Sequence, residues 1–287
     1  MRLRQSAIPW LFIAPSLIIF SIFHFFPLAI LVYSSFTRWN LVSPPQFIGL
    51  ENYLRIISDE LFIKSLFITI IFVFSSLIVN VILSLTIALL TEKPDSKLAT
   101  LCRFIIFIPY VLPDAASAGI WNLMFFPHPS SPINVLLTQL GIGWQGWIGD
   151  KNLALPTIIL YYIWKNVGFS TLVYVAGLKA IPKIFYDAAE VDGADKLAII
   201  RHVTMPLLKP ITLFILITSL IAGWQSFTDI FVLTKGGPGT ATTTLSIYIY
   251  HTAFGEGLAG RAAVISIILF VIILVLTIIQ LKYIKSE

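Results

Sequence analysis

The sequence predicts an all-α integral membrane protein with six transmembrane helices, and three observations predict this fold class. Of its 287 residues, 57% are hydrophobic and only 11% are charged, and the mean hydropathy is +0.91. A soluble domain of this length could not bury so much apolar surface. Six apolar stretches have the length of a membrane span, and most cations lie between these stretches, as is typical of membrane topology.

The six predicted spans form a single transmembrane domain that covers residues 1–287. A helix needs roughly 20 apolar residues to cross the hydrocarbon core. Six segments meet this requirement, at about 10–35, 63–90, 104–126, 154–178, 211–234 and 262–283. The first segment follows Arg2 and Arg4 as in a signal peptide, but it is about twice the length of a signal h-region and lacks a clear cleavage site. We therefore expect it to be retained as the first span.

The distribution of Lys and Arg predicts the orientation of the chain. An even number of spans places both termini on one side, and the side richer in cations is cytoplasmic. Twelve cations fall on the side of the termini: Arg2, Arg4, Lys93, Lys97, Arg103, Lys179, Lys183, Lys196, Arg201, Lys209, Lys282 and Lys285. Six fall on the opposite side: Arg38, Arg55, Lys64, Lys151, Lys235 and Arg261. We therefore expect both termini to be cytoplasmic.

The cytoplasmic segment 179–209, between the fourth and fifth spans, carries the most informative pattern. Pro182 is suited to the start of a short helix, and Gly193 to the left-handed residue that ends one. A second short helix is expected to begin near Asp195, where an acidic side chain can cap free amides, and to stop before Pro206. The sequence thus predicts two short helices outside the membrane.

These two helices are expected to dock in a groove of another protein. In the first helix, Phe185, Ala188 and Ala189 form a small apolar face. A helix that lies on anionic lipid would have a strongly basic polar face instead. The loop is acidic at Asp187, Glu190, Asp192 and Asp195.

The run Asp187-Ala-Ala-Glu-Val-Asp-Gly-Ala194, followed by Pro206, resembles the Glu-Ala-Ala coupling loop of binding-protein-dependent ABC importer permeases. That family has Glu-Ala-Ala-x-x-x-Gly and a later proline, and its loop sits in a cleft of the cytoplasmic ATPase subunit and transmits its closure. The residues that match this loop are Asp187, Ala188, Ala189, Asp192, Gly193, Ala194 and Pro206. Asp187 replaces the usual Glu, which keeps the charge and shortens its reach.

Three further segments resemble the carbohydrate-uptake branch of this family, the maltose-type and glycerol-phosphate-type permeases. They are Phe47-Ile-Gly-Leu-Glu-Asn-Tyr53, Leu178-Lys-Ala-Ile-Pro182 and Leu233-Thr-Lys-Gly-Gly-Pro238. The last is similar to the first permease of the usual heterodimeric pair. The resemblance implies a type I ABC importer permease fold with cytoplasmic coupling helices, in the inner membrane of a bacterial cell.

The resemblance also implies the partners of the chain. They are a second homologous permease subunit, two ATPase (nucleotide-binding) subunits, an external solute-binding protein that delivers a sugar, oligosaccharide or related polyol or glycoside, and membrane lipid, but no nucleic acid. The segment Gly236-Gly-Pro-Gly239 lacks the Gly-Lys-Ser/Thr ending of a phosphate-binding loop. ATP and Mg²⁺ are therefore expected on the ATPase subunits, and this chain is expected not to be an enzyme.

Lys165 and Asp114 are the candidates for an ion pair inside the membrane. Both lie about 16 Å from the ends of their predicted spans, counting 1.5 Å per helical residue, and charged side chains at that depth are costly. A structural pair or a contact with another subunit is favoured over direct substrate contact.

The substrate pathway is expected to combine polar groups with aromatic faces, as sugars require. By resemblance to the maltose-type family, the matching positions are Tyr110, Asp114, Asn166, Phe169, Ser219, Gly223 and Ser226. Nearby residues of suitable chemistry are Tyr162, Trp164, Trp224 and Gln225. The acid at 114 and the glycine at 223 differ from the maltose case, so the ligand need not be maltose, and helix packing is an equally good interpretation of each aromatic residue.

Two other classes of function are kept as alternatives. A secondary transporter driven by H⁺ or Na⁺ would use a membrane carboxylate such as Asp114 as a relay. An integral membrane enzyme would need catalytic side chains clustered at one membrane face, and the sequence shows no such cluster. The four histidines are scattered without metal-ligand spacing, so no metal site is expected.

Overall fold

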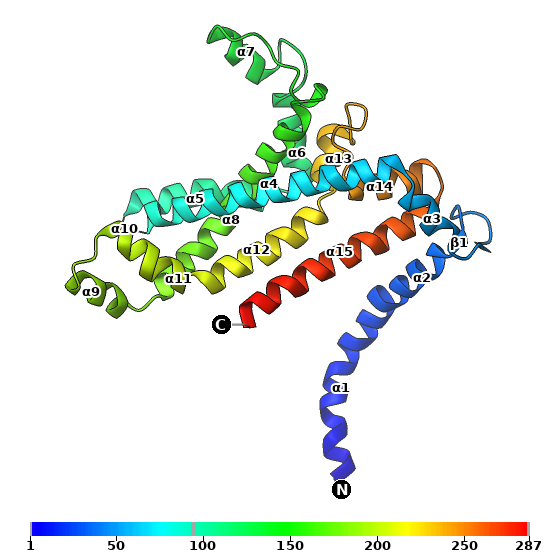
Figure 1. The fold of residues 1–287 in the computed structure, drawn as a ribbon, viewed down its shortest axis with the longest axis horizontal. Helices are drawn as coiled ribbons and strands as arrows, with labels where there is room; N and C mark the ends of the chain where they lie inside the picture. The colour runs from blue at the N-terminus through cyan, green and yellow to red at the C-terminus, as the bar shows by residue number, and fades with distance from the viewer. Residues whose placement is uncertain (1, 93–95, 286–287) are drawn as a thin grey trace. The chain divides into compact units, whose positions relative to one another are not determined.

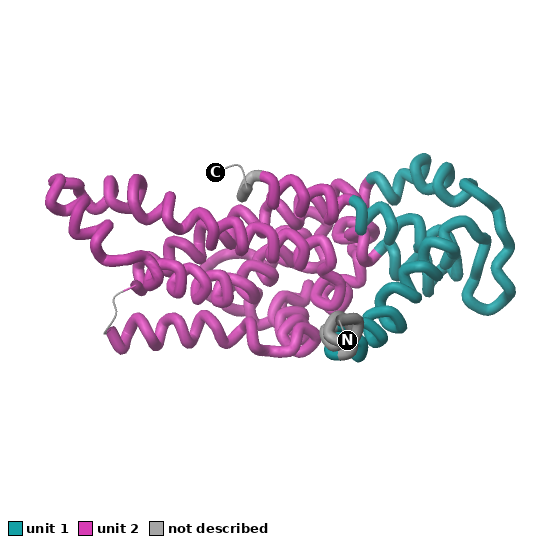
Figure 2. The backbone as a smooth tube through the Cα atoms, turned by 90° about the horizontal axis from the view of Figure 1, so that it is seen from below, with its two compact units in different colours: residues 1–63, 248–271 teal, residues 64–247, 272–287 magenta. Residues whose placement is uncertain are grey.

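The computed structural model describes residues 2–92 and 96–285, and most of these residues are helical (Figure 1). Lys93, one of the cations used to predict orientation, and the terminal residues Met1, Ser286 and Glu287 lie outside the described residues. The chain forms two compact units, of which unit 1 comprises residues 1–63 and 248–271 and unit 2 comprises residues 64–247 and 272–287 (Figure 2).

The elements follow one another in a simple order along the chain. The first part contains α1 (Arg2–Phe20), η1 (Ser21–Phe25), α2 (Phe26–Ser35), β1 (Thr37–Arg38), β2 (Gln46–Phe47), α3 (Glu51–Ile57) and α4 (Glu60–Thr91). The middle contains α5 (Lys97–Val111), α6 (Asp114–Met124), α7 (Pro132–Gln139), η2 (Trp147–Gly149) and α8 (Ala154–Ala180). The last part contains α9 (Lys183–Val191), α10 (Lys196–Ile199), η3 (Ile200–Thr204), α11 (Met205–Leu207), α12 (Lys209–Trp224), α13 (Thr228–Thr234), α14 (Leu245–Tyr250), η4 (His251–Gly255) and α15 (Ala259–Lys285).

Among the described residues, four helical segments are long and apolar enough to cross a membrane, and six are if each bent pair counts as one span. The four are Phe12–Ser35, Glu60–Thr91, Ala154–Ala180 and Ala259–Lys282. The bent pairs are α5 with α6, at 100°, and Lys196–Leu207 with α12, at 62°. The predicted number of six spans therefore requires two broken ones.

Two predicted spans are interrupted. The predicted span 104–126 is divided between α5 and α6, because Pro113 forces the preceding Leu112 into an extended conformation (φ −66°, ψ 143°). The predicted span 211–234 is divided between α12 and α13 by residues 225–227. Hydropathy measures apolar length and does not report such changes of direction.

Two π-helical turns precede prolines. The turn η1 comes two residues before Pro27, and η3 comes two residues before Pro206. Proline lacks an N–H group and its ring clashes with the carbonyl one turn earlier, so a widened turn lets the helix continue. The prediction that the second coupling helix stops before Pro206 was wrong, because it continues through η3 and α11 to Leu207.

The core of unit 2 is built around α8. Tyr174, Val175 and Leu178 of α8 are buried in one cluster with Ala88 of α4 and Leu208. Gly168 allows α8 to touch α5, because a Cβ atom there would lie 2.2 Å from the Ile106 carbonyl oxygen. This close contact sets the position of the side chains of α5 and α8 that face each other.

Candidate translocation cavity and coupling loop

The break between α5 and α6 is held by two side chains of α8. The ammonium group of the buried Lys165 donates a hydrogen bond to the Leu112 carbonyl oxygen and lies 3.1 Å from Asp114 Oδ1. One turn earlier, the Tyr161 hydroxyl lies 2.8 Å from Ser117 Oγ and donates to the Asp114 carbonyl oxygen at 3.3 Å. The two residues proposed as an ion pair are thus in contact.

The charges at this break match the dipoles of the two helices. Lys165 binds a carbonyl left without a helical partner at the carboxyl end of α5, where a cation is favoured. Asp114 lies in the first turn of α6, where an anion is favoured. The side chain of Lys165 is 7% exposed, whereas that of Asp114 is 63% exposed. Lys165 is therefore buried at the bend, and Asp114 is the accessible partner.

A cavity of about 300 Å³ lies between α4, α5, α8 and α12, within unit 2. It is lined by Ser76, Leu77, Asn80, Tyr110, Tyr162, Asn166, Phe169, Ser170, Thr218, Ser219 and Ala222. None of these described lining residues is charged. A cavity with hydroxyl, amide and aromatic groups can bind a neutral polar ligand without desolvating an ionised side chain.

Two stacked rings form the aromatic wall of this cavity. The rings of Tyr110 on α5 and Phe169 on α8 have centroids 4.8 Å apart and planes 16° apart. Phe107 extends the stack, with its centroid 5.7 Å from that of Tyr110. Tyr110 remains 39% exposed. The flat apolar faces of sugar rings pack well on such surfaces.

An amide from α4 forms the polar wall. Asn80 is 2% exposed and its Nδ2 donates to Ser170 Oγ at 2.8 Å. Its carbonyl oxygen Oδ1 is buried and receives no hydrogen bond from the described residues. A hydroxyl group of a ligand could supply the missing donor, because buried acceptors are normally satisfied.

Five of the eleven predicted pathway residues line the cavity, and six, among them the half-buried Trp164, do not. Those that line it are Tyr110, Tyr162, Asn166, Phe169 and Ser219. Asp114 lies at the α5–α6 break, Gly223 packs near Val73, Trp224 is 2% exposed, Gln225 is exposed, and Ser226 donates to Asp229 Oδ1 at 2.6 Å. Gln225 and Ser226 lie in the break between α12 and α13, beyond the residues of α12 that line the cavity.

The contribution of α4 was missed in the sequence. Ser65, Thr69, Ser76, Asn80 and Ser84 are each at most 2% exposed and repeat at helical spacing along an otherwise apolar span. This spacing places them on one face of the helix. Polar residues inside a span are functional candidates. The helical spacing of these five polar residues was therefore the feature of the sequence that could have indicated a role for α4.

The coupling loop has the predicted local structure, except that its second helix continues past Pro206 to Leu207. The helix α9 begins after Pro182, Gly193 has a φ of +78°, and the Asp195 carboxylate accepts a hydrogen bond from the Ala198 N–H at 2.7 Å. A hydrogen bond from Thr204 to the Tyr186 hydroxyl, at 3.5 Å, joins the second helix to the first.

The exposed apolar residues of α9 include Ile184, Ala188 and Val191, at i, i+4 and i+7, and Phe185 beside them. Ile184 is 70% exposed and Val191 is 88% exposed, and Leu197 after the turn is 72% exposed. Of the residues matched to the family loop, Asp187, Ala188, Asp192, Gly193 and Pro206 are exposed, and Ala189 and Ala194 are half-buried. Of the expected face, Phe185 and Ala188 are exposed together with Ile184 and Val191, whereas Ala189 is half-buried.

The family model for the "binding-protein-dependent transport system inner membrane component" matches residues 80–284. The chain belongs to this family. It is a permease subunit of an ABC importer, as the resemblance of its coupling loop predicts.

Relatives of this permease extend over the whole chain. It is 35% identical to the trehalose/maltose transport system permease protein of Thermococcus litoralis, over 98% of this chain and 95% of the relative. It is 34% identical to the sulfoquinovosyl glycerol transport system permease protein of Agrobacterium fabrum, over 96% and 90%. It is 32% identical to the sn-glycerol-3-phosphate transport system permease protein of the same organism, over 99% and 96%.

The fold of this permease is similar to that of a solved bacterial ABC transporter involved in the import of the acidic polysaccharide alginate. The TM-score is 0.85 at 25% identity, over 99% of this chain and 98% of the other. The predicted type I ABC importer permease fold is thereby confirmed.

Proposed function

We propose that this permease carries a neutral carbohydrate, an oligosaccharide or a related glycoside, through the cavity between α4, α5, α8 and α12. The observation that carries this proposal is the composition of the lining, which combines the Tyr110–Phe169 stack with amide and hydroxyl groups and contains no charged residue among those described. A phosphate, sulfonate or carboxylate would be expected to need Arg or Lys at its binding position. The relatives are named for both neutral and anionic cargo, and the uncharged lining favours the neutral class.

The proposed assembly contains four further proteins. A second, homologous permease would complete the pathway, since six spans from one chain form half of it, and two ATPase subunits would bind ATP and Mg²⁺ and perform the hydrolysis. An external solute-binding protein would deliver the substrate. The family supports ATP-driven import over a pathway driven by an ion gradient.

The proposed orientation follows from the cation count. With both termini in the cytoplasm of a bacterial cell, the loop after span four lies on the cytoplasmic side and the loop after span one lies outside. The exposed face of α9 would then dock in the ATPase subunit, with Asp187 and Asp192 at its rim. Closure of the ATPase pair would move α9 and α10 and open the cavity toward the outside.

Uptake into proteoliposomes that contain the complete importer tests the assignment of the cavity. Phe169→Ala removes one ring of the stack and should reduce the initial rate of uptake of a neutral oligosaccharide about fivefold to tenfold, because an aromatic contact contributes about 1 kcal/mol. The matched control is Phe67→Ala on α4, where the ring is 61% exposed and does not line the cavity. Equal rates in the two variants, or uptake of anionic glycosides alone, would contradict the proposal.

A further inference from the structure

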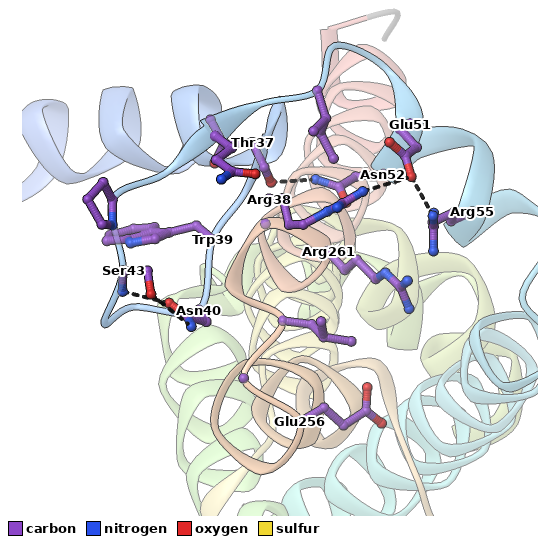
Figure 3. A pocket seen from close by; sticks show the side chains of 16 residues that line it. Thr37, Arg38, Trp39, Asn40, Ser43, Glu51, Asn52, Arg55, Glu256 and Arg261 are labelled. Carbon is purple, nitrogen blue, oxygen red and sulfur yellow. Dashed lines mark hydrogen bonds and ion pairs between the residues drawn. The ribbon is translucent and has the colours of Figure 1, made fainter.

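A second cavity, of about 650 Å³, lies entirely within unit 1 (Figure 3). Its walls are the loop from Thr37 to Ile48, the first turns of α3, and residues 256–261 at the start of α15. This cavity includes part of the Phe47-Ile-Gly-Leu-Glu-Asn-Tyr53 motif, to which the translocation pathway assigns no role.

The frame of this cavity is fixed by buried hydrogen bonds. The Asn52 side chain is 4% exposed, and its Nδ2 donates to the carbonyl oxygens of Ser35, at 2.9 Å, and Thr37, at 2.8 Å. A Cβ atom on Gly260 would lie 2.0 Å from the Thr37 carbonyl oxygen, so only glycine allows α15 to begin this close to the loop. The frame thus places side chains from α3, β1 and α15 around one space.

Three guanidinium groups line this cavity, but only two carboxylates do. Glu51 Oε1 pairs with both Arg38, at 3.4 Å, and Arg55. The hydrogen bond from Arg55 lowers the pKa of Glu51, so this carboxylate is ionised and shared between two cations. Arg261 has no ion-pair partner among the described residues, and neither has Glu256 (Figure 3). The lining therefore holds three cations and two anions, with Arg261 half-buried and available for one further carboxylate.

In the six-span topology proposed above, with α5 and α6 counted as one span, this cavity lies on the side opposite to the coupling loop. The loop 36–50 follows the first span and the coupling loop follows the fourth, so three crossings separate the two. In that orientation an occupant of the cavity is exterior and is not an ATPase subunit. The neutral lining of the translocation cavity also argues against the cargo as the source of an anion.

We propose that the unit 1 cavity is a socket for an acidic side chain, Asp or Glu, on the surface of the external solute-binding protein. The proposal rests on the function proposed above, because it takes that protein as the partner. Arg261 would bind the incoming carboxylate in a two-pronged geometry that Lys cannot reproduce. The volume of about 650 Å³ is larger than one carboxylate requires and would leave room for the turn that carries the acidic residue.

The test uses the complete importer in nanodiscs and the purified solute-binding protein that stimulates its ATP hydrolysis. The measured quantity is the concentration of binding protein that gives half-maximal stimulation. Arg261→Gln should raise this concentration about tenfold, as expected for a charge pair at a protein interface, and Arg261→Lys should raise it less. Lys151→Gln, which removes an exposed cation outside the cavity, is the matched control and should leave it unchanged.

If Arg261→Gln perturbs assembly, a second test reverses the charges on the two partners, with Glu at position 261 and Arg on the binding protein. Arg261→Glu should weaken stimulation, and replacement of one acidic surface residue of the binding protein by Arg should restore it in a scan of those residues. An unchanged concentration in Arg261→Gln, or no restoring exchange, would overturn the socket. An effect of Arg261→Gln that disappears in nanodiscs of phosphatidylcholine alone would assign the cavity to an anionic lipid headgroup and also overturn it. Each of these failures leaves the Phe169→Ala result, and with it the proposed function, unaffected.

Discussion

The Gly168→Ala substitution should destabilise the helix pair that carries the translocation cavity. The added Cβ atom would lie 2.2 Å from the Ile106 carbonyl oxygen and 2.8 Å from Phe107 Cα, both of which are backbone atoms. An ordinary carbon–oxygen contact is about 3.3 Å, so α5 and α8 must separate by about 1 Å at this point. Side-chain rotation cannot relieve an overlap with the backbone.

The magnitude follows from the cost of overpacking. Extra methyl groups in a packed interior cost about 1–3 kcal/mol, and a gap of about 1 Å removes up to half of the dispersion energy of neighbouring contacts. We expect a value near the upper end, about 3 kcal/mol, which corresponds to a fall of about 6–12 °C in the melting temperature of a chain of this size.

Fluorescence-detected size-exclusion chromatography of the heated importer, with green fluorescent protein fused to this chain, measures that fall. The matched control is Gly119→Ala in α6, where a Cβ atom meets nothing within 4 Å. Alanine is also the better helix former, so Gly119→Ala should be neutral or slightly stabilising. Melting temperatures for Gly168→Ala and Gly119→Ala that agree within error would refute the close α5–α8 contact.

Three further predictions concern the bend, the coupling loop and the frame of unit 1. Lys165→Met should reduce importer assembly strongly and Asp114→Asn only weakly, because Lys165 also binds the Leu112 carbonyl oxygen. Equal yields of the two variants on size exclusion, or rescue of Lys165→Met by Asp114→Asn, would contradict a role of Lys165 in holding the α5–α6 bend. Gly193→Val places a branched residue at φ +78°, at a cost of about 1–3 kcal/mol. This variant should uncouple ATP hydrolysis from uptake. The control Gly143→Val, at an open position without positive φ, should leave the two coupled. Asn52→Ala removes two buried hydrogen bonds and should lower the melting temperature of the importer by the equivalent of about 2 kcal/mol. A melting temperature equal to that of the exposed control Asn40→Ala would show that the frame of the unit 1 cavity does not depend on the Asn52 side chain.

Local chemistry was predictable from the sequence, and long-range geometry was not. The helix α9, the turn at Gly193 and the Asp195 cap were expected because proline, glycine and aspartate determine these features within a few residues. The 100° bend at Leu112 was missed because apolar residues continue on both sides of it, although Pro113 was a signal.

The cavity shows the same division. Tyr110, Asn166 and Phe169 were predicted by resemblance, whereas Asn80 contributes through a hydrogen bond to Ser170, ninety positions along the chain. Such a pairing depends on how α4 packs on α8, and one sequence does not contain that information. The shared Glu51, and Arg261 without an ion-pair partner among the described residues, were likewise not predictable, since α3 and α15 meet only in the fold.

The most direct measurement of the central claim is a cryo-EM map of the complete importer trapped with vanadate and a neutral oligosaccharide. We expect density for one sugar ring against the Tyr110–Phe169 stack, with a hydroxyl group within hydrogen-bond distance of Asn80 Oδ1. Ligand density outside the cavity between α4, α5, α8 and α12, or a map in which only an anionic ligand occupies that cavity, would contradict the proposed pathway.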